Sequence, residues 1–236
     1  SKILKYSKPV WKKIMELKKK NKTILFEGAQ GVLLDIDHGT YPFVTSSNTL
    51  AGAAFAGTGC SPDTINYILG IVKAYTTRVG EGPFPTELKN ETGNRIGRRG
   101  NEFGTVTNRK RRCGWLDAVL VKQSCSISGI NGIALTKIDV LDQFKDLYVC
   151  VAYKLNGKKI DYLPSTLQDQ IKVKPMYKRF NGWLKNTRGI NKWNKLPKNA
   201  QKYIKFIKNY CGVTISSIST SPKREDTILL ENPFKK

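Results

Sequence analysis

Four consecutive cationic side chains, at residues 109–112, lie in the segment 103–114, which reads F-G-T-V-T-N-R-K-R-R-C-G. Thr105 and Thr107 come just before the cations, and a glycine stands near each end of the segment. Arginine binds carboxylates and phosphates through two parallel hydrogen bonds, and threonine adds a neutral donor. This loop is therefore suited to a dicarboxylate or a phosphorylated ligand. The alternative is a solvated basic turn, which is the usual fate of an isolated charge run.

A second chemical pattern is the segment 133–139, I-A-L-T-K-I-D, where an apolar strand runs into T-K-x-D. Its form is that of the guanine-reading motif of GTP-binding proteins. An aspartate at this place accepts hydrogen bonds from guanine N1–H and the 2-amino group, while the lysine stem packs along the base. Adenine leaves that carboxylate unpaired, which penalises the wrong base. The alternative is a strand-end salt bridge.

The segment 33–48 carries His38, which is the single histidine of the chain, and a dense set of small donors that includes Thr45. Such donors suit a phosphate monoester, although turns rich in serine and threonine also occur without ligands. Just before it, Gln30 lies between two glycines after an apolar run. The sequence contains no G-x-S-x-G and no H-E-x-x-H motif, and a lone histidine is more often structural than catalytic.

The composition bounds the class of protein. The 236 residues, 39% of them hydrophobic, are enough for one large core, and we expect a single α/β unit over residues 1–236. The net charge of +23 favours an anionic partner, although a lysine-biased genome would produce the same excess. Five cysteines without C-x-x-C indicate reduced thiols and a cytoplasmic location. No apolar run is long enough to span a membrane, and no signal-peptide pattern is present.

Hydrophobic periodicity predicts the elements that position these motifs. We expect helices in the first 22 residues, from 61 to 72 with Ser61 as N-cap, from Trp115 to about Gly129, and at 200–210. We expect strands at 23–26, 74–79, 133–136, 213–219 and 227–230, and a hairpin at 146–162 with its turn at Asn156 and Gly157. Residues 87–100 read as polar surface, and 164–197 show little periodicity.

Several of these segments together resemble adenylosuccinate synthetase, in order and at matching spacing. They are F-E-G-A-Q-G, L-L-D-I-D-H-G-T-Y-P-F-V-T-S-S-N-T, R-V-G-E-G-P-F-P-T-E, G-N-E-F-G, R-K-R-R-C-G-W-L-D, L-T-K-I-D-V-L-D, C-V-A-Y and I-S-T-S-P. The resemblance covers residues 23–234 and implies a mixed α/β fold with a largely parallel central sheet, flanking helices and a β-hairpin. This is the P-loop-NTPase-like fold of the family without its amino-terminal part.

The resemblance implies the GTP-dependent ligation of IMP and L-aspartate to adenylosuccinate, with Mg²⁺, in AMP biosynthesis. It also implies roles for residues of this chain. IMP would be bound by Gln30, Thr45 and Arg109. Aspartate would be bound by Thr105, Val106, Thr107, Asn108, Arg109, Lys110 and Arg111. GTP would be bound by Arg111, Lys137, Ile138, Asp139, Ser219, Thr220 and Ser221.

The sequence departs from the family pattern at three places. Val106 and Asn108 stand where the basic loop usually reads T-T-G-R, and Ser221 replaces a glycine in S-T-G-P. These changes bring aspartate and guanine binding into question, because they remove a hydroxyl and two flexible positions.

The chain also lacks the family's glycine-rich phosphate loop, catalytic aspartate and histidine, and magnesium ligands. We therefore expect no catalytic residue and no metal ligand here, and a chain that is inactive alone. A separate amino-terminal half is a possible partner, and the family forms homodimers. The alternative function is a basic nucleic-acid-binding protein, whose affinity would fall steeply with salt.

Overall fold

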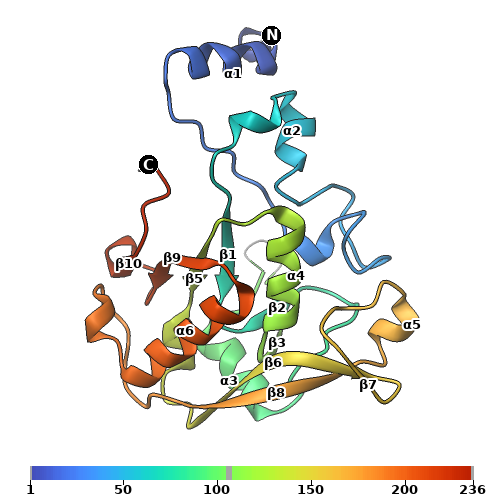
Figure 1. Cartoon of the computed structure of the whole chain (residues 1–236), viewed down its shortest axis with the longest axis vertical. Coiled ribbons are helices and arrows are strands. Elements are labelled where there is room, and N and C mark those ends of the chain that lie inside the picture. Colours follow the sequence, from blue (N-terminus) through green and yellow to red (C-terminus); the bar gives the residue numbers. More distant parts are fainter. Residues whose placement is uncertain (1, 105–107, 235–236) are drawn as a thin grey trace.

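The computed structural model describes residues 2–104 and 108–234, which form a mixed α/β fold (Figure 1). The helices are α1 (Val10–Lys19), α2 (Ala53–Thr58), α3 (Glu91–Arg99), α4 (Ala118–Ser128), α5 (Leu167–Gln170) and α6 (Lys198–Cys211). The strands are β1 (Leu69–Lys73), β2 (Thr76–Arg78), β3 (Arg112–Gly114), β4 (Leu116–Asp117), β5 (Gly132–Thr136), β6 (Asp146–Leu155), β7 (Lys158–Ile160), β8 (Lys174–Asn181), β9 (Thr214–Ser219) and β10 (Thr227–Leu229). Short 3-10 helices include Val32–Leu34, Pro62–Thr64 and Ile138–Leu141.

The described strands form three sheets where a single central sheet was expected. The first has the order β1-β5-β9-β10, with β1, β5 and β9 parallel and β10 antiparallel. In the second, β6 pairs in parallel with β4 and antiparallel with β7 and β8. Strands β2 and β3 form a small antiparallel ribbon. The mixed α/β class is therefore confirmed, with the parallel strands concentrated in the first sheet.

The core lies between the two larger sheets and helices α4 and α6, which contact each other. The face of α6 that turns inward carries Tyr203, Ile204 and Ile207, each at most 1% exposed. Their spacing of one and then three residues is the pattern that sequence analysis used to predict this helix, and Gly212 ends it in the left-handed conformation. Burial of each such side chain stabilises the fold by about 1.5–3 kcal/mol.

Several other predicted elements are confirmed. Helix α4 ends at Gly129 with φ +62°, and the hairpin β6–β7 turns through Asn156 and Gly157, both with positive φ. Strands β2, β5, β9 and β10 lie within or beside their predicted ranges. The five cysteines are free thiols, as expected.

Two predicted elements are wrong. Residues 61–72 do not form a helix: a 3-10 turn without side-chain capping by Ser61 leads into β1, because pairing with β5 outweighs the helical spacing. Residues 23–26 form no strand, and Leu25 is 75% exposed. A strand needs a neighbour for its backbone groups, and no described strand pairs with this segment.

Two further segments are more ordered than their sequences suggested. The polar segment 87–100 contains α3, which buries Gly93, Ile96 and Gly97. The unassigned region 164–197 contributes β8, whose pairing with β6 is the longest in the molecule's described part. Both are held by long-range packing that local periodicity does not report.

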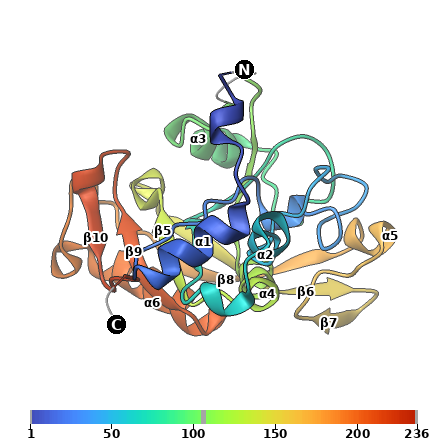
Figure 2. The same cartoon turned by 90° about the horizontal axis from the view of Figure 1, so that it is seen from above.

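Helices α1 and α2 lie together at one end of the molecule, away from the sheets (Figures 1 and 2). The predicted α1 is confirmed, but of its apolar positions only Ile14 is buried. Trp11 and Met15 are each about half exposed. This end of the molecule thus presents an apolar helical surface to solvent.

Candidate functional site at the strand ends

The carboxyl ends of β1, β5 and β9 lie at one edge of the parallel sheet. The register pairs Lys73 with Thr136 and Leu135 with Ile218, so Lys73, Lys137 and the segment after Ser219 meet there. Ligands of α/β proteins collect at this edge of a parallel sheet. The T-K-I-D and I-S-T-S-P motifs, which start at residues 136 and 218, are therefore brought to the same edge.

Lys137 makes the turn at the end of β5. Its φ of +60° is left-handed, which lets the chain leave the strand and enter the 3-10 helix Ile138–Leu141. Its ammonium group donates to the Gly100 carbonyl at 2.6 Å and to Oε1 of Glu102 at 3.0 Å. Ile138 is fully buried and fixes the start of the 3-10 helix. The position of the predicted base-stacking stem is thus set at both ends.

The carboxylate of Asp139 is largely shielded from solvent, and Arg188 and Arg99 nearby do not donate hydrogen bonds to it. Its side chain is 15% exposed, and burial raises its pKa, although the positive charge of Arg188 opposes that shift. The Arg188 contact is 3.8 Å long, which exceeds hydrogen-bond distance. Arg99 approaches from α3 but donates to the carbonyl oxygens of Asp139 and Val140, not to the carboxylate. Ligand N–H groups would therefore find an acceptor at Asp139.

A hollow of about 340 Å³ lies beside Asp139. Its other lining residues are Arg99, Asp142, Gln143, Asn186 and Arg188. Buried Asp142 anchors the far wall: its carboxylate accepts from Trp183 Nε1 at 2.5 Å and from Thr187 N and Oγ1 at 2.7 and 2.9 Å. These bonds hold the loop after β8 over the end of β5.

The segment after β9 is fixed by its own hydroxyls. Buried Thr220 donates through Oγ1 to the carbonyl groups of Ile190 and Asp226. The Ser219 hydroxyl donates to the Ser221 carbonyl at 2.7 Å. Ser221, the residue that replaces a family glycine, donates to Asp226 Oδ2 at 2.6 Å and accepts from Lys223 N. Its side chain is therefore engaged within the segment.

The four cations of the basic run have different surroundings. Arg112 is structural, because it forms a two-pronged pair with Glu87 and donates to the carbonyl groups of Gly80 and Gly82. Arg111 donates to Glu102 at 2.9 Å, and Lys110 to Asn94 at 2.9 Å. Arg109 is exposed, and its carbonyl accepts from Gly104 N. The run is therefore neither a uniform ligand loop nor a wholly solvated turn.

Three predicted members of the aspartate loop, Thr105, Val106 and Thr107, lie outside the described residues. The fourth position, Asn108, has φ +50°. Asparagine tolerates this left-handed region better than most side chains, so the backbone shape for which glycine is suited is kept. The Asn108 amide donates to the Gly104 carbonyl at 2.8 Å.

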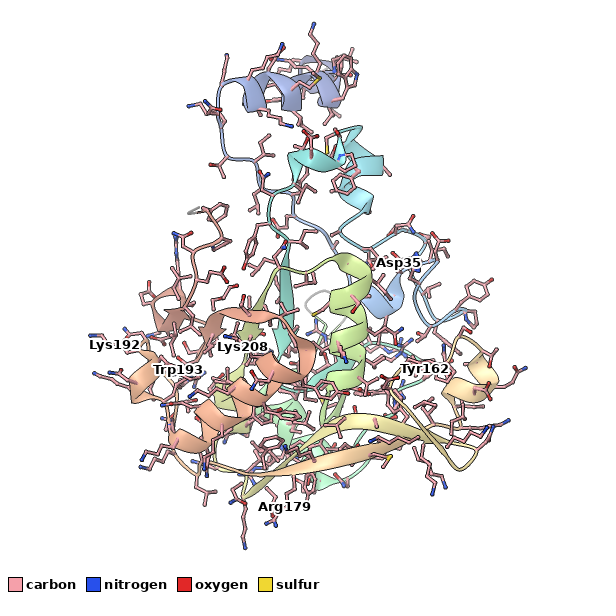
Figure 3. The ribbon with its side chains drawn as sticks, in the orientation of Figure 1. Asp35, Tyr162, Arg179, Lys192, Trp193 and Lys208 are labelled. Carbon is pink, nitrogen blue, oxygen red and sulfur yellow. The ribbon has the colours of Figure 1, made fainter. Side chains whose placement is uncertain are left out.

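The donor-rich segment 31–50 is organised by Asp35, which is fully buried and labelled in Figure 3. Its carboxylate accepts from the backbone amides of Asp37, His38, Thr49 and Leu50. Burial pushes the pKa of Asp35 up, but these hydrogen bonds hold it at about 2. The loop is thus wrapped around an ionised carboxylate, with His38 exposed at its surface.

Of the predicted IMP ligands in this region, Thr45 is half-buried, and its amide donates to the Leu34 carbonyl. Gln30 is exposed, with φ +72°. Arg78 of β2 binds the loop to the sheets by donating to Thr40 Oγ1 at 2.8 Å and to the Phe43 carbonyl. Arg78 also donates to the Glu81 carbonyl, in the same short loop whose glycines accept from Arg112. Segment 31–50 and the basic run are thereby tied to one connector.

Glu102, which joins several side chains at the strand ends, was not predicted from the sequence. Glu102 is fully buried and binds Lys73, Tyr75, Arg111 and Lys137. The available signal was its place in G-N-E-F-G, one acidic residue between glycines ahead of four cations. Within the described residues, no group of three His, Cys, Asp or Glu side chains could hold a metal ion.

The family model for adenylosuccinate synthetase matches residues 1–228. The chain belongs to the adenylosuccinate synthetase family. A solved structure described as fully ligated adenylosuccinate synthetase from Plasmodium falciparum superposes with a TM-score of 0.92 at 39% identity. The superposition covers 94% of this chain and 53% of the Plasmodium protein. These matches confirm the family that the sequence resemblance indicated.

A second solved structure, the cyanophage S-2L succinoaminodeoxyadenylate synthetase bound to dGMP and dATP, superposes with a TM-score of 0.56 at 16% identity, which shows a shared fold. The matched region covers 93% of this chain and 51% of the phage protein. The chain thus spans about half the length of both solved relatives. Within the described residues, no helix is long and apolar enough to cross a membrane.

Proposed function

We propose that this chain carries the guanine-reading and aspartate-binding part of the site at which GTP drives the ligation of IMP and L-aspartate. The observation that carries the proposal is the meeting of Lys137, Asp139 and the Ser219–Ser221 segment at one sheet edge, where Asp139 also lines a hollow. Two motifs that are separate in sequence converge where a nucleotide would be read. The ligands remain those implied by the family, and the comparisons give the nucleic-acid-binding alternative no support.

In this proposal Asp139 accepts from guanine N1–H and the 2-amino group, and the stem of Lys137 packs along the base. The raised pKa and the incomplete hydrogen bonding of Asp139 fit that role, because base donors would replace the hydration the buried carboxylate lacks. Adenine presents no such donor pair. Ile138 and the Ser219–Ser221 segment would complete the wall of the base site.

The aspartate side of the site would be formed by residues 105–111. Arg109 would lie between the aspartate carboxylate and the IMP ribose, and Arg111 would reach toward GTP. Asn108 supports this proposal, since its backbone has the left-handed conformation and its amide donates to the Gly104 carbonyl. Gln30 would contact the hypoxanthine, and Thr45 would contact the 5′-phosphate from the segment 31–50 that Asp35 holds in one shape.

The chemical steps would require residues beyond these 236. The sequence has no G-x-x-x-x-G-K loop to hold the triphosphate, so we propose that the phosphate-loop part of the family fold acts together with this chain. Open surfaces support such a partner. The outer edge of β1 is unpaired within the described sheet, and Ile71 of this strand is 76% exposed. Leu25, in the segment 23–26, is 75% exposed. The apolar side of α1 is open as well.

The direct test is to assay adenylosuccinate formation by the purified chain, alone and mixed with a recombinant amino-terminal half of the Plasmodium falciparum enzyme. We expect no product from the chain alone. Product from the mixture, and its loss with D139N in this chain, would support the proposal. Product from the chain alone would contradict the need for a partner.

A further inference from the structure

The carboxylate of Glu102 is the meeting point of three segments, two of which the proposed function uses separately. Its Oε1 accepts from Tyr75 Oη at 2.5 Å and from Lys137 Nζ at 3.0 Å. Its Oε2 accepts from Lys73 Nζ at 2.8 Å and from Arg111 Nη1 at 2.9 Å. One fully buried carboxylate thus joins the end of β1, the guanine-reading turn and the basic run.

The contact with the basic run is doubled. The Arg111 amide donates to the Glu102 carbonyl at 2.9 Å, in addition to the side-chain pair. Glu102 is itself held by its amide, which donates to the Gly97 carbonyl at the end of α3. The end of α3 therefore fixes the position of the carboxylate, and the carboxylate in turn fixes the positions of the three cationic groups.

The cluster holds three cations against one anion. The three cationic side chains keep between 25% and 35% of their surface exposed, whereas Glu102 has none. Burial pushes the pKa of Glu102 up, but the hydrogen bonds from Lys73 and Tyr75 hold it at about 2, so the carboxylate is ionised at neutral pH. The net positive charge consequently faces outward, toward the sheet edge where the nucleotide would bind.

One cation would be enough to neutralise the buried carboxylate of Glu102, but three contact it. Here the ammonium of Lys137 is drawn back onto Gly100 and Glu102, which fixes the direction of its methylene stem two residues before Asp139. Without the carboxylate, Lys73, Arg111 and Lys137 would repel one another, and the ammonium would move toward solvent. The stem would then leave the place where it can pack against a base.

We propose that Glu102 is a positioning residue for guanine recognition, which holds Lys137 for the base and fixes Arg111 of the basic run beside it. This inference rests on the proposed function, since it assumes that a guanine nucleotide binds at the strand ends. It adds a residue to which sequence and resemblance assigned no role. It also gives a physical link between the nucleotide and aspartate sides of the site.

The test measures the Kd of GDP and of inorganic pyrophosphate by calorimetry, at near-physiological salt and well below the melting temperature. Four proteins are compared: the unchanged chain, E102Q, E102D and D117N. Pyrophosphate reports attraction to charge, and GDP reports charge and base together. D117N is the matched control, because Asp117 is a buried carboxylate whose partners are Tyr153 and Leu120 on the other sheet and α4.

We expect E102Q to weaken GDP binding by about tenfold or more, since the charged hydrogen bond that holds Lys137 is lost. Pyrophosphate binding should stay the same or tighten, because the cluster gains one net positive charge. E102D, which keeps the charge on a shorter stem, should lie between E102Q and the unchanged chain. D117N should leave both affinities unchanged.

Equal GDP affinity in the unchanged chain and E102Q would overturn the positioning role, as would a parallel loss of GDP and pyrophosphate, which indicates collapse of the site. If E102Q does not fold, E102D decides by the same two criteria. Failure of the unchanged chain to bind GDP would overturn the proposed function and this role together. That outcome differs from the failure of Glu102 alone, in which the unchanged chain binds GDP.

Discussion

Asp35 and Glu102 are both fully buried carboxylates with a pKa near 2, but different kinds of group hold them. Asp35 is surrounded by backbone amides from both ends of one loop. Glu102 is surrounded by three cationic side chains and a tyrosine. The first arrangement fixes the shape of a segment. The second arranges charge at a sheet edge, and only there can removal of the carboxylate change ligand preference without changing the backbone.

The largest expected effect on global stability belongs to E102Q. Removing one partner of a buried charge cluster leaves the remaining charges uncompensated, and partial exposure of the cations reduces the usual cost. We expect a loss of about 2–4 kcal/mol in the free energy of unfolding, measured by urea denaturation. An unchanged midpoint and slope would show that the cations find other partners at no cost.

D35N should act locally. Asparagine keeps one acceptor oxygen but loses the other, so the amides of Thr49 and Leu50 are left without their partner. A buried, unsatisfied amide costs about 1–3 kcal/mol, which predicts hydrogen exchange of these two amides that is faster by about tenfold to a hundredfold. Exchange should be unchanged in β5 and β9. Uniform acceleration across the chain would contradict a local role.

The pH dependence separates Asp117 from both of these carboxylates. Burial raises the pKa of Asp117 to about 6, despite the Tyr153 hydrogen bond that opposes it. A raised folded-state pKa contributes stability that is present below the unfolded value of 3.8 and lost as pH rises through about 6. Asp35 and Glu102 have the opposite sign, since their stabilisation is present at neutral pH and lost as pH falls toward 2.

D117N should therefore flatten the change in stability between pH 4 and pH 6, by about 1–3 kcal/mol. Melting series for the unchanged chain and D117N across this range provide the measurement. E102Q serves as the comparison, because it should leave this window intact and alter the acid limb instead. A D117N series parallel to that of the unchanged chain would show that Asp117 does not titrate there.

The smallest effect is expected from S221G, which restores the family's glycine. It removes the hydrogen bonds to Asp226 and from Lys223, so we expect a loss of about 1 kcal/mol in stability. The GDP affinity should change by less than about threefold, because the Ser221 hydroxyl is engaged within its own segment. A large gain in GDP affinity would show that the side chain obstructs the base.

Whether the role of a residue can be predicted from the sequence depends on where its partners lie. T-K-I-D was recognisable because its lysine and aspartate have the spacing of a guanine-reading motif. Strand β5 was predicted from its own apolar run. Glu102 was not recognisable, because its partners Lys73 and Lys137 are 29 and 35 residues away and meet only through the pairing of β1 with β5. The local sequence shows an acidic residue ahead of four cations, but nothing in it indicates the contacts with Lys73 and Lys137.

The location of pairing partners also explains why two predicted elements are wrong. Residues 65–72 have helical apolar spacing, yet β1 forms because β5 offers a parallel partner. Residues 23–26 have strand composition, yet they form no strand because no described strand pairs with them. In both cases the local sequence favoured the wrong structure, and the presence or absence of a pairing strand decided the outcome.

The central claim is that the strand ends form a guanine-nucleotide site, and a thermal melt tests it most directly. The purified chain and D139N are melted alone and with GDP, ADP, IMP or L-aspartate, since a ligand that binds only the folded state raises the midpoint. We predict that GDP raises the midpoint of the unchanged chain, that ADP does not, and that D139N removes the difference. Equal shifts with GDP and ADP, or no shift with GDP, would contradict the claim.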